Sequence, residues 1–365
     1  MIFETTVEKL IGVIENADRV TARNASLPAL GTILLVVSGT TLKIRATNLS
    51  LGVEFELQIK KEKDGVTAID GKTLYTFLNT LPKNEKIKIT QEDSILTLTT
   101  AHNKTTIKTH PYEDFPTLPS VSGTTIQIPQ KEFIRGIKNT YFSAAVSDIK
   151  PEIASVYMAS NENVLYFVAT DSFRLAEKKE NLKRAVEFSP ILIPYKNCIE
   201  IVRILENTTE EITLSISENQ IAIMVSGVYI TSRLTSGSFP DYKQIIPKEF
   251  QTEIIVLKQD LLNTLKAANI FSDKFNQVTF SITPSKKKFE CISKNSDVGE
   301  YSGVIDATLT GDDVSISLNQ RYLIECLSFI PQDSIAIGLN GGAKAVVIRG
   351  VGDNSFTYLL MPMNR

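Results

Sequence analysis

A short strand that runs directly into a helix decides the fold, and its clearest copy is Ile191-Leu192-Ile193-Pro194 followed by Lys196 to Leu205. The same unit occurs twice more along the chain. These copies are Thr67-Ala68-Ile69-Asp70 followed by Lys72 to Leu81, and Val314-Ser315-Ile316-Ser317-Leu318 followed by Gln320 to Ile330. Recurrence of one strand and helix unit indicates a repeat architecture, which has to be recognised before single motifs are interpreted.

Equal spacing shows that the three copies belong to one repeat. Leu74, Cys198 and Tyr322 occupy the same position in the three copies, and the two intervals between them are both 124 residues. A second strand and helix unit also recurs three times, with apolar residues three and four positions apart in each helix. Its copies are Met1 to Glu4 with Val7 to Ile14, Ile126 to Pro129 with Lys131 to Ile137, and Ile254 to Leu257 with Gln259 to Leu265.

The rest of each copy alternates apolar and polar residues, which predicts antiparallel strands. Such segments are Thr41 to Ala46, Ser94 to Thr100, Val164 to Ala169 and Gln220 to Val225. Proline-marked joints, Asp114 to Pro119 and Phe239 to Tyr242, end the first two copies. We therefore predict an α+β protein of three repeated domains, at residues 1–121, 122–245 and 246–365, each with two helices on one side of antiparallel sheet.

The composition is that of an ordinary globular protein, with 42% hydrophobic and 22% charged residues among 365. No apolar run approaches the roughly 18 residues that span a bilayer, and no secretory signal is recognisable, so no membrane partner is expected. Three scattered cysteines, an odd number, do not form a disulfide framework, so we expect the reducing cytoplasm. The net charge of −2 argues against a protein that coats nucleic acid with its whole surface.

Four segments, in this order, resemble the bacterial sliding clamps, the beta subunits of DNA polymerase III. They are Leu27 to Gly31, Ala169 to Ala176, Phe239 to Tyr242 and Tyr358 to Met363. The resemblance covers the whole chain. It implies a non-enzymatic processivity factor whose partners are duplex DNA, the replicative polymerase, a separate clamp loader, other clients and a second copy of the chain.

The resemblance also implies a homodimer that closes into a six-domain ring lined by twelve helices. Twelve helices spaced ~8–10 Å apart, each ~10 Å wide, leave an opening of ~20–28 Å. Such an opening admits a DNA duplex. A sliding ring has to attract phosphates without reading bases, because base contacts would hold it at one sequence.

Basic side chains on the predicted inner helices, with Arg23 beside the Leu27-Pro28 loop, meet that need, although for any one of them alone a solvated helix face is the better interpretation. The candidates are Lys9, Arg23, Lys72, Lys131, Arg135, Lys138, Lys196, Arg203, Lys266 and Arg321. Neighbouring glutamates dilute them, so a weak and salt-sensitive attraction is expected. Lys286 to Lys288 lies between two predicted strands and is interpreted as a solvated hairpin tip.

The family's clients insert a short peptide into a hydrophobic pocket between the second and third domains. The resemblance places that pocket at Ile153, Thr170, Ser172, Phe173, Arg174, Leu175, Pro240, Gln244, Ile245, Asn319, Tyr322, Leu359, Leu360, Met361, Pro362 and Met363. Many members have Gly-His where this chain has Ser172-Phe173, and a basic residue in place of Gln244. The alternative for the last five positions is a strand that packs in the core.

The resemblance places the subunit interface between an edge strand of the first domain and an edge of the third. The matching residues are Lys104, Ile107 and Lys108 on one side and Ile270, Phe271, Asp297 and Glu300 on the other. Pairing two strand edges also removes the aggregation hazard that each presents alone.

A catalytic function has little support. The two histidines, His102 and His110, both lie near the edge of the first domain, and no cysteine and histidine cluster has metal-ligand spacing. Gly71-Lys72-Thr73 resembles the end of a phosphate-binding loop but lacks the upstream glycine. We predict no enzyme activity, metal or cofactor. The alternatives are a metal-dependent phosphoryl hydrolase and a repeat scaffold that never encircles DNA.

Overall fold

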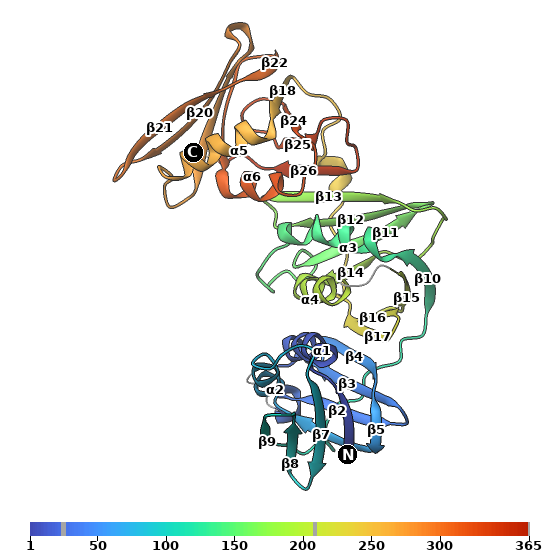
Figure 1. The fold of residues 1–365 in the computed structure, drawn as a ribbon. Coiled ribbons are helices and arrows are strands. Elements are labelled where there is room, and N and C mark those ends of the chain that lie inside the picture. The colour runs from blue at the N-terminus through green and yellow to red at the C-terminus, as the bar shows by residue number, and fades with distance from the viewer. Residues whose placement is uncertain (23–26, 207–209, 364–365) are drawn as a thin grey trace. The chain divides into compact units, whose positions relative to one another are not determined.

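The computed structural model describes residues 1–22, 27–206 and 210–363. The chain forms two compact units, Met1–Ile134 with Lys196–Thr235, and Arg135–Tyr195 with Ser236–Arg365. Each unit contains two antiparallel sheets, and the strands of the second repeat are divided between the units (Figure 1). Within the described ranges, every helix is too short or too polar to cross a membrane.

The first unit contains a five-stranded and an eight-stranded sheet. The five-stranded sheet has the order β5-β1-β7-β8-β9, with β1 (Ile2–Thr6), β5 (Lys60–Lys63), β7 (Lys86–Glu92), β8 (Ile95–Thr99) and β9 (Lys104–Lys108). The eight-stranded sheet has the order β10-β15-β16-β17-β4-β3-β2-β6. Its strands are β2 (Ile33–Ser38), β3 (Thr41–Thr47), β4 (Leu51–Gln58), β6 (Gly65–Ile69), β10 (Thr124–Pro129), β15 (Glu211–Ile216), β16 (Gln220–Val225) and β17 (Val228–Arg233).

Helices of the first unit bury their apolar stripes against these sheets. Helices α1 (Val7–Val20) and α2 (Gly71–Leu78) lie side by side (Figure 1), and α1 also packs on β3 and β4. Gly71 makes the close approach possible, because a Cβ there would lie 2.8 Å from Asp18 Oδ1. The Gly71-Lys72-Thr73 segment therefore begins a packed helix, with its glycine required by helix packing.

The second unit contains a nine-stranded and a four-stranded sheet. The nine-stranded sheet has the order β14-β11-β12-β13-β26-β25-β24-β18-β22, and the four-stranded sheet has the order β21-β20-β19-β23. Their strands are β11 (Ser155–Asn161), β12 (Val164–Thr170), β13 (Arg174–Asn181), β14 (Ile191–Pro194), β18 (Thr252–Leu257), β19 (Gln277–Thr283), β20 (Lys288–Asn295), β21 (Gly299–Ile305), β22 (Ala307–Gly311), β23 (Val314–Asn319), β24 (Ser334–Leu339), β25 (Val346–Gly350) and β26 (Phe356–Leu360).

Helices α5 (Lys258–Asn269) and α6 (Gln320–Leu327) pack side by side over strands of the third repeat (Figure 1). Their buried residues Leu261, Leu265 and Leu323 share one hydrophobic core with Phe280 and Tyr358. This arrangement is the predicted pair of helices against antiparallel sheet, with strands of two sheets contributing to the core.

Two strand pairs, called here the first and second seams, make each long sheet continuous across repeats. At the first seam β17 pairs with β4, from Val228↔Phe55 to Ser232↔Leu51. At the second seam β13 pairs with β26, from Arg174↔Leu360 to Lys178↔Phe356. Backbone hydrogen bonding, and not only the linkers, therefore joins neighbouring repeats.

Buried glutamines tie together the helices of a repeat. Gln130 begins α3 (Gln130–Lys138) and donates its side-chain amide to the carbonyl of Leu205 at the end of α4 (Tyr195–Leu205). Gln320 begins α6 and donates in the same way to Leu265 in α5. Gln130 is 3% exposed and Gln320 is fully buried. The Leu205 carbonyl, at the end of α4, is one that a helix end leaves without an intrahelical partner, whereas Leu265 lies one turn before the end of α5.

The predicted elements are confirmed with shifts of a few residues at their ends. All six predicted helices form, and the three copies built on Leu74, Cys198 and Tyr322 become α2, α4 and α6. Lys286 to Lys288 lies at the turn between β19 and β20, as predicted. The domain limits at 121/122 and 245/246 remain predictions.

Candidate functional site

The tight turn between β12 and β13 sets the geometry of the predicted peptide pocket. Asp171 Oδ1 accepts hydrogen bonds from the backbone N–H of Phe173 at 2.9 Å and of Arg174 at 3.0 Å. Ser172 between them has φ +78°, a left-handed conformation that favours glycine. The turn projects Phe173 outward, with 65% of its surface exposed. Arg174 Nε also donates to Asp171 Oδ2 at 2.9 Å, so Asp171 and Arg174 form a structural turn pair.

Arg174 does not frame the pocket with a free guanidinium. Its side chain is 9% exposed, forms an ion pair with Glu325 of α6 and donates to the carbonyl of Phe142 at 2.7 Å. The guanidinium carbon lies 4.0 Å from the centre of the Tyr322 ring. Arg174 therefore fixes the turn and α6 in place. It supports the pocket from below and is not a free cation at the pocket's edge.

The floor of the predicted pocket is an apolar cluster on one face of the nine-stranded sheet. Leu175 and Leu359 are register partners across the second seam, and they cluster with Val168, Val347 and Tyr242. All five residues are at most 5% exposed. Since β strands alternate faces, the residues on this face are every second one along β13 and β26.

Exposed apolar side chains stand around this floor. Ile245 in the 3₁₀ turn η3 (Tyr242–Ile245) is 55% exposed, and Met361 after β26 is 43% exposed. Met361 N–H donates to the carbonyl of Phe173 at 2.8 Å, which holds the two segments together. These two side chains, with Phe173, are large apolar groups that remain exposed to water.

Tyr242 explains the Phe239 to Tyr242 motif. Its hydroxyl donates to Glu177 Oε2 at 2.7 Å, and burial together with the nearby Glu177 raises the Tyr242 pKa far above its ordinary value. Phe239 stacks on Tyr157 with ring centres 5.1 Å apart. The joint between repeats is therefore anchored to the sheet that carries the pocket.

Leu360 is corrected, because alternation turns its side chain to the opposite face. It is 1% exposed and belongs to the core of the third repeat with Tyr358 and Val346. For Leu360 the alternative of a core-packed strand holds. Of the other predicted residues, Ile153 and Thr170 are nearly buried at 7% and 9% exposure. Gln244 is exposed and donates to Asp241 Oδ2 at 2.6 Å.

The C-terminal segment passes the start of α6. Asn319 caps α6 by accepting from Tyr322 N–H at 3.2 Å, and Met363 N–H donates to the carbonyl of Ser317 at 2.8 Å. Pro362 lies between Met361 and Met363, and both Pro362 and Met363 are half-buried. Asn319, Tyr322 and Met363 are thus brought together by backbone contacts at this end of the site.

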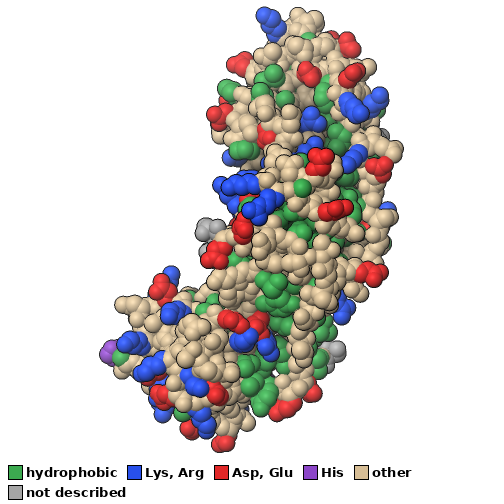
Figure 2. Space-filling view, turned by 90° about the vertical axis from the view of Figure 1, so that its right-hand side faces the viewer, with side chains coloured by type: hydrophobic (Ala, Val, Ile, Leu, Met, Phe, Trp, Pro, Cys, Tyr) green, Lys and Arg blue, Asp and Glu red, His purple; other side chains and the backbone are tan. Residues whose placement is uncertain are grey.

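Most of the predicted DNA-facing side chains are exposed on helices. They are Lys9, Lys72, Lys131, Lys196, Arg203, Lys266 and Arg321. Arg203 and Arg321 are also paired within their helices, to Glu200 at 2.8 Å and Glu325 at 3.1 Å. Lys138 is half-buried, and Arg23 lies outside the described residues. Figure 2 shows Lys and Arg side chains interspersed with Asp and Glu on one face, as the net charge of −2 leads one to expect.

Arg135 has a structural partner that the sequence did not reveal. It forms a two-point ion pair with Glu180, which is 2% exposed in β13. Lys178, 7% exposed, donates to Ser355 Oγ at 2.6 Å and lies 3.9 Å from Glu180. Arg135 thus neutralises a buried carboxylate, so a role as a free phosphate contact is corrected.

The two strands predicted to form the subunit interface are both sheet edges. β9 ends the five-stranded sheet, and β21 ends the four-stranded sheet. Lys104, Lys108, Asp297 and Glu300 are exposed, Ile270 is 68% exposed, and Phe271 is half-buried. Ile107 is only 9% exposed within the single chain, so an apolar contact of its side chain with Ile270 and Phe271 has little surface left to use.

Nothing in the described ranges resembles a metal or thiol centre. Among these residues no group of three or more His, Cys, Asp or Glu side chains is placed to hold a metal ion. Cys198, Cys291 and Cys326 are buried free thiols, and burial raises the pKa of Cys291 to about 12, which leaves it inert at neutral pH.

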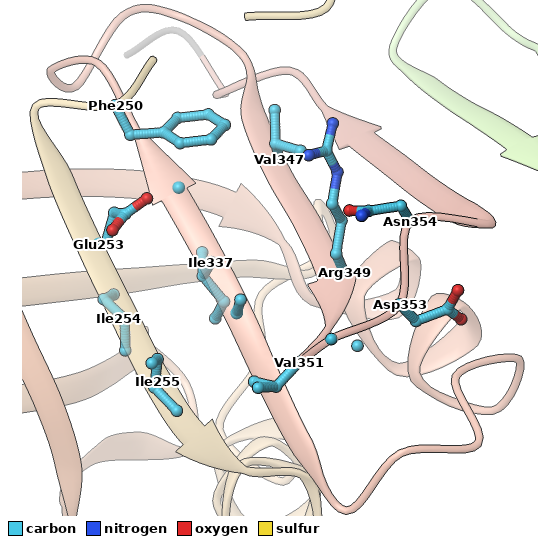
Figure 3. A pocket seen from close by; sticks show the side chains of 14 residues that line it. Phe250, Glu253, Ile254, Ile255, Ile337, Val347, Arg349, Val351, Asp353 and Asn354 are labelled. Atoms are coloured by element: carbon cyan, nitrogen blue, oxygen red, sulfur yellow. The ribbon is translucent and has the colours of Figure 1, made fainter. Parts of the chain in front are cut away.

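A hollow of about 240 Å³ lies elsewhere on the third repeat. Figure 3 shows it over β18, β24 and β25, with the Phe250 ring at one end, Ile255 and Val351 along its sides, and the Arg349 side chain on its wall. None of its lining residues belongs to the predicted peptide pocket.

The whole chain is similar in sequence to one protein family. Models of the DNA polymerase III beta subunit match it domain by domain: the N-terminal domain over residues 1–119, the central domain over 127–241 and the C-terminal domain over 243–364. The beta sliding clamp of Synechococcus elongatus is 28% identical over 345 residues, covering 92% of each chain. That of Haemophilus influenzae is 24% identical over 367 residues, covering 100% of each.

Solved structures share the fold. A sliding clamp (DNA polymerase III subunit beta) from Pseudomonas aeruginosa, bound to griselimycin, superposes with a TM-score of 0.94 at 23% identity and covers 100% of both chains. The beta subunit of DNA polymerase III from Thermotoga maritima has a TM-score of 0.94 at 24% identity, covering 100% of this chain and 99% of that one.

Proposed function

This chain belongs to the DNA polymerase III beta subunit family, and from that premise we propose that its pocket of Phe173, Leu175, Ile245, Leu359 and Met361 binds the peptides of its clients. The chain is a sliding clamp and processivity factor of replication. The finer assignments, which are the pocket residues, the DNA-facing residues, the subunit interface and the absence of catalysis, are proposals.

The observation that carries the pocket is the exposed apolar ring around a buried apolar floor. Phe173, Ile245 and Met361 are 65%, 55% and 43% exposed, while Leu175 and Leu359 beneath them are 2% and 3% exposed. Exposed aromatic and methionine side chains adapt to leucine or phenylalanine anchors of a short peptide. The Asp171 turn and Arg174 hold this surface rigid before binding, which lowers the entropy cost of recognition.

Encirclement of DNA is supported by the exposed basic residues on helices of every repeat. Lys9, Lys131 and Lys266 represent the three repeats. Their interaction with phosphate is non-specific and weakens as salt rises. We propose a homodimer in which β9 of one subunit meets β21 of the other, using backbone groups and the charged residues Lys104, Lys108, Asp297 and Glu300. A separate loader opens this ring, and the protein works in the cytoplasm without a cofactor.

Fluorescence anisotropy with a labelled peptide of the Gln-Leu-x-Leu-Phe type tests the pocket. We expect saturable binding by the native chain, and binding weakened about tenfold or more in Phe173→Ala and Met361→Ala, since each removes an exposed anchor of the kind that dominates interfaces. Met224→Ala, a 38%-exposed methionine on β16 of the first unit, is the matched control and should bind normally. Equal binding by all four proteins contradicts this pocket.

A retention assay separates a clamp from a repeat scaffold. After loading, a topological ring stays on circular duplex DNA and leaves when the circle is cut, whereas a scaffold shows no dependence on circularity. Divalent-metal-dependent release of phosphate from model esters by the purified chain would instead support the hydrolase.

A further inference from the structure

A basic cavity of about 420 Å³ adjoins the predicted pocket in the second unit. Four cations line it, together with one carboxylate, one tyrosine and two apolar residues. The lining residues are Tyr166, Glu177, Lys179, Lys243, Ile246, Pro247, Lys248 and Arg349. The lining therefore carries a net charge of +3 on a chain whose total is −2, so its charge is local and not a reflection of composition.

Only one of the four cations is neutralised by the cavity's own carboxylate. Lys179 Nζ lies 3.1 Å from Glu177 Oε1, and Glu177 is also held by the Tyr242 hydroxyl. Within the described part of the chain, no carboxylate lies within ion-pairing distance of Lys243, Lys248 or Arg349, and the buried Nε of Arg349 has no hydrogen-bond partner. The ammonium groups of Lys243 and Lys248, both exposed, can each form a charge-assisted hydrogen bond with a ligand carboxylate.

The cavity is continuous with two apolar surfaces. Arg349 also lines the hollow of Figure 3, beside Phe250 and Val347. Ile246 packs on the same apolar cluster as Leu175 and Leu359, the floor of the pocket. Along β13, Leu175, Glu177 and Lys179 face the same side, and the four residue steps from Leu175 to Lys179 span about 13 Å.

We infer that this basic cavity binds acidic side chains that flank the client peptide. The inference rests on the proposed peptide pocket and names a further feature of its partners. A client anchored over Leu175 and extended along β13 reaches Lys179 after about four residues, where carboxylates meet Lys243, Lys248 and Arg349. Apolar residues of the same segment fit beside Phe250.

A nucleic acid fits the cavity less well than an acidic polypeptide. Lys179 and Lys243 already lie over the Tyr166 ring, with Nζ 5.9 and 5.3 Å from its centre. Tyr166 is the one aromatic ring in the lining, so no ring face is free to stack a base, as single-strand binding requires. The apolar hollow next to Arg349 favours a chain that mixes acidic and apolar residues.

Anisotropy with matched peptides tests the inference. One labelled peptide carries the client motif with neutral flanks, and two others carry aspartates about four residues from the motif on either side. We expect one acidic peptide to bind the native chain roughly 3- to 10-fold tighter than the neutral one at low ionic strength, with the advantage shrinking as salt rises.

Charge-matched variants locate the effect. Lys243→Gln/Lys248→Gln should abolish the acidic advantage and leave neutral-peptide binding unchanged, and Arg349→Gln should reduce the advantage. Lys286→Gln/Lys287→Gln removes the same charge from the exposed turn between β19 and β20 and should keep the advantage.

Each remaining outcome decides against the inference. If neutral and acidic peptides bind the native chain equally, or if the advantage survives Lys243→Gln/Lys248→Gln, the acidic site is wrong while the peptide pocket stands. If no peptide binds, the proposed pocket fails and the inference fails with it. A short oligonucleotide that binds through Lys243 and Lys248 more tightly than the acidic peptides would assign the cavity to nucleic acid.

Discussion

The first and second seams use the same backbone geometry but differ in side-chain chemistry. The first seam relies mainly on neutral groups: Gly52 faces Thr231, and the Asn197 side-chain amide donates to Ser232 Oγ at 2.8 Å and to the carbonyl of Ser50 at 3.2 Å. Its charged register residue is Glu54, opposite Tyr229, which forms ion pairs with Lys43 and Arg45 of β3. The second seam is charged. Its strand β13 carries Arg174, Glu177, Lys178 and Glu180 at low exposure.

The difference coincides with the position of the proposed peptide pocket, which lies at the second seam. Buried charges are tolerated only with partners, and at the second seam the partners come from different elements: Glu325 from α6 for Arg174, Arg135 from α3 for Glu180, and Ser355 ahead of β26 for Lys178. We interpret these pairs as fixing three elements around the peptide pocket. At the first seam the charged residue Glu54 pairs with the neighbouring strand β3, and the contact from a helix is the neutral Asn197 amide of α4.

The largest contrast is expected from Glu180→Ala. This change leaves the buried Lys178 without the nearby Glu180 carboxylate and breaks the ion pair of Arg135, whose side chain is 41% exposed. Removal of one member of a buried pair costs up to about 3–5 kcal/mol. Urea denaturation followed by far-UV circular dichroism measures the loss, because the chain has no tryptophan. Glu15→Ala is the control, since Glu15 and its partner Arg19 on α1 are 36% and 43% exposed and the pair contributes little. Equal losses would mean that the second seam is not held by charge.

Asn197→Ala tests the first seam and should cost less. It removes a buried amide that serves Ser50 and Ser232, which predicts a loss of about 1–3 kcal/mol in the free energy of unfolding. The exposed Asn263→Ala on α5 should change stability by about 0.5 kcal/mol or less. A loss larger than that of Glu180→Ala would reverse the proposed contrast.

Ser172→Gly is expected to stabilise the turn beside the second seam. Ser172 has φ +78°, and glycine removes a left-handed strain of about 1 kcal/mol while adding some entropy to the unfolded chain. The net gain should be at most about 1 kcal/mol, visible as a higher melting temperature with peptide affinity retained. Ser296→Gly, at an exposed turn where φ is not positive, should not raise the melting temperature.

The smallest expected effect is a pH dependence at Lys178. Burial is the main reason that the Lys178 pKa is lowered, although Glu180 opposes it. Between the lowered folded pKa and the unfolded value near 10.4, the unfolded state holds more proton, so stability rises with pH. The native chain should therefore gain stability relative to Lys178→Met as pH rises through that window. A difference that stays constant with pH contradicts a depressed Lys178 pKa.

Local patterns in the sequence predicted the elements well, because helices and strands follow short-range periodicity. The three copies aligned on Leu74, Cys198 and Tyr322 are α2, α4 and α6. The seams were not predicted, since β4 and β17 or β13 and β26 pair across more than one hundred residues and no local signal specifies the partner.

The position of the proposed pocket was predicted from family resemblance. The ion pairs around it were not predicted. Arg135 and Arg174 look like surface cations in the sequence, but the structure gives them Glu180 and Glu325 as partners. In the strand Arg174 to Asn181, charged residues point to both faces of the sheet, so the sequence pattern does not separate the two faces. One face carries the floor residue Leu175 and the cavity residue Lys179. Five charged residues in one strand were the available signal for a buried network.

Because of the seams, neighbouring repeats are held together by strand pairing as well as by the covalent linkers. No seam hydrogen bond runs through the linker 114–123 or the linker 236–249, and Tyr229 of β17 holds the first linker by donating to the carbonyl of Pro119 at 2.8 Å. A protease nick in either linker should therefore leave the repeats attached. Two separately produced fragments, divided at one linker, should then assemble through the seam. The rate at which a bound fragment exchanges with free fragment measures how strongly the paired strands hold it.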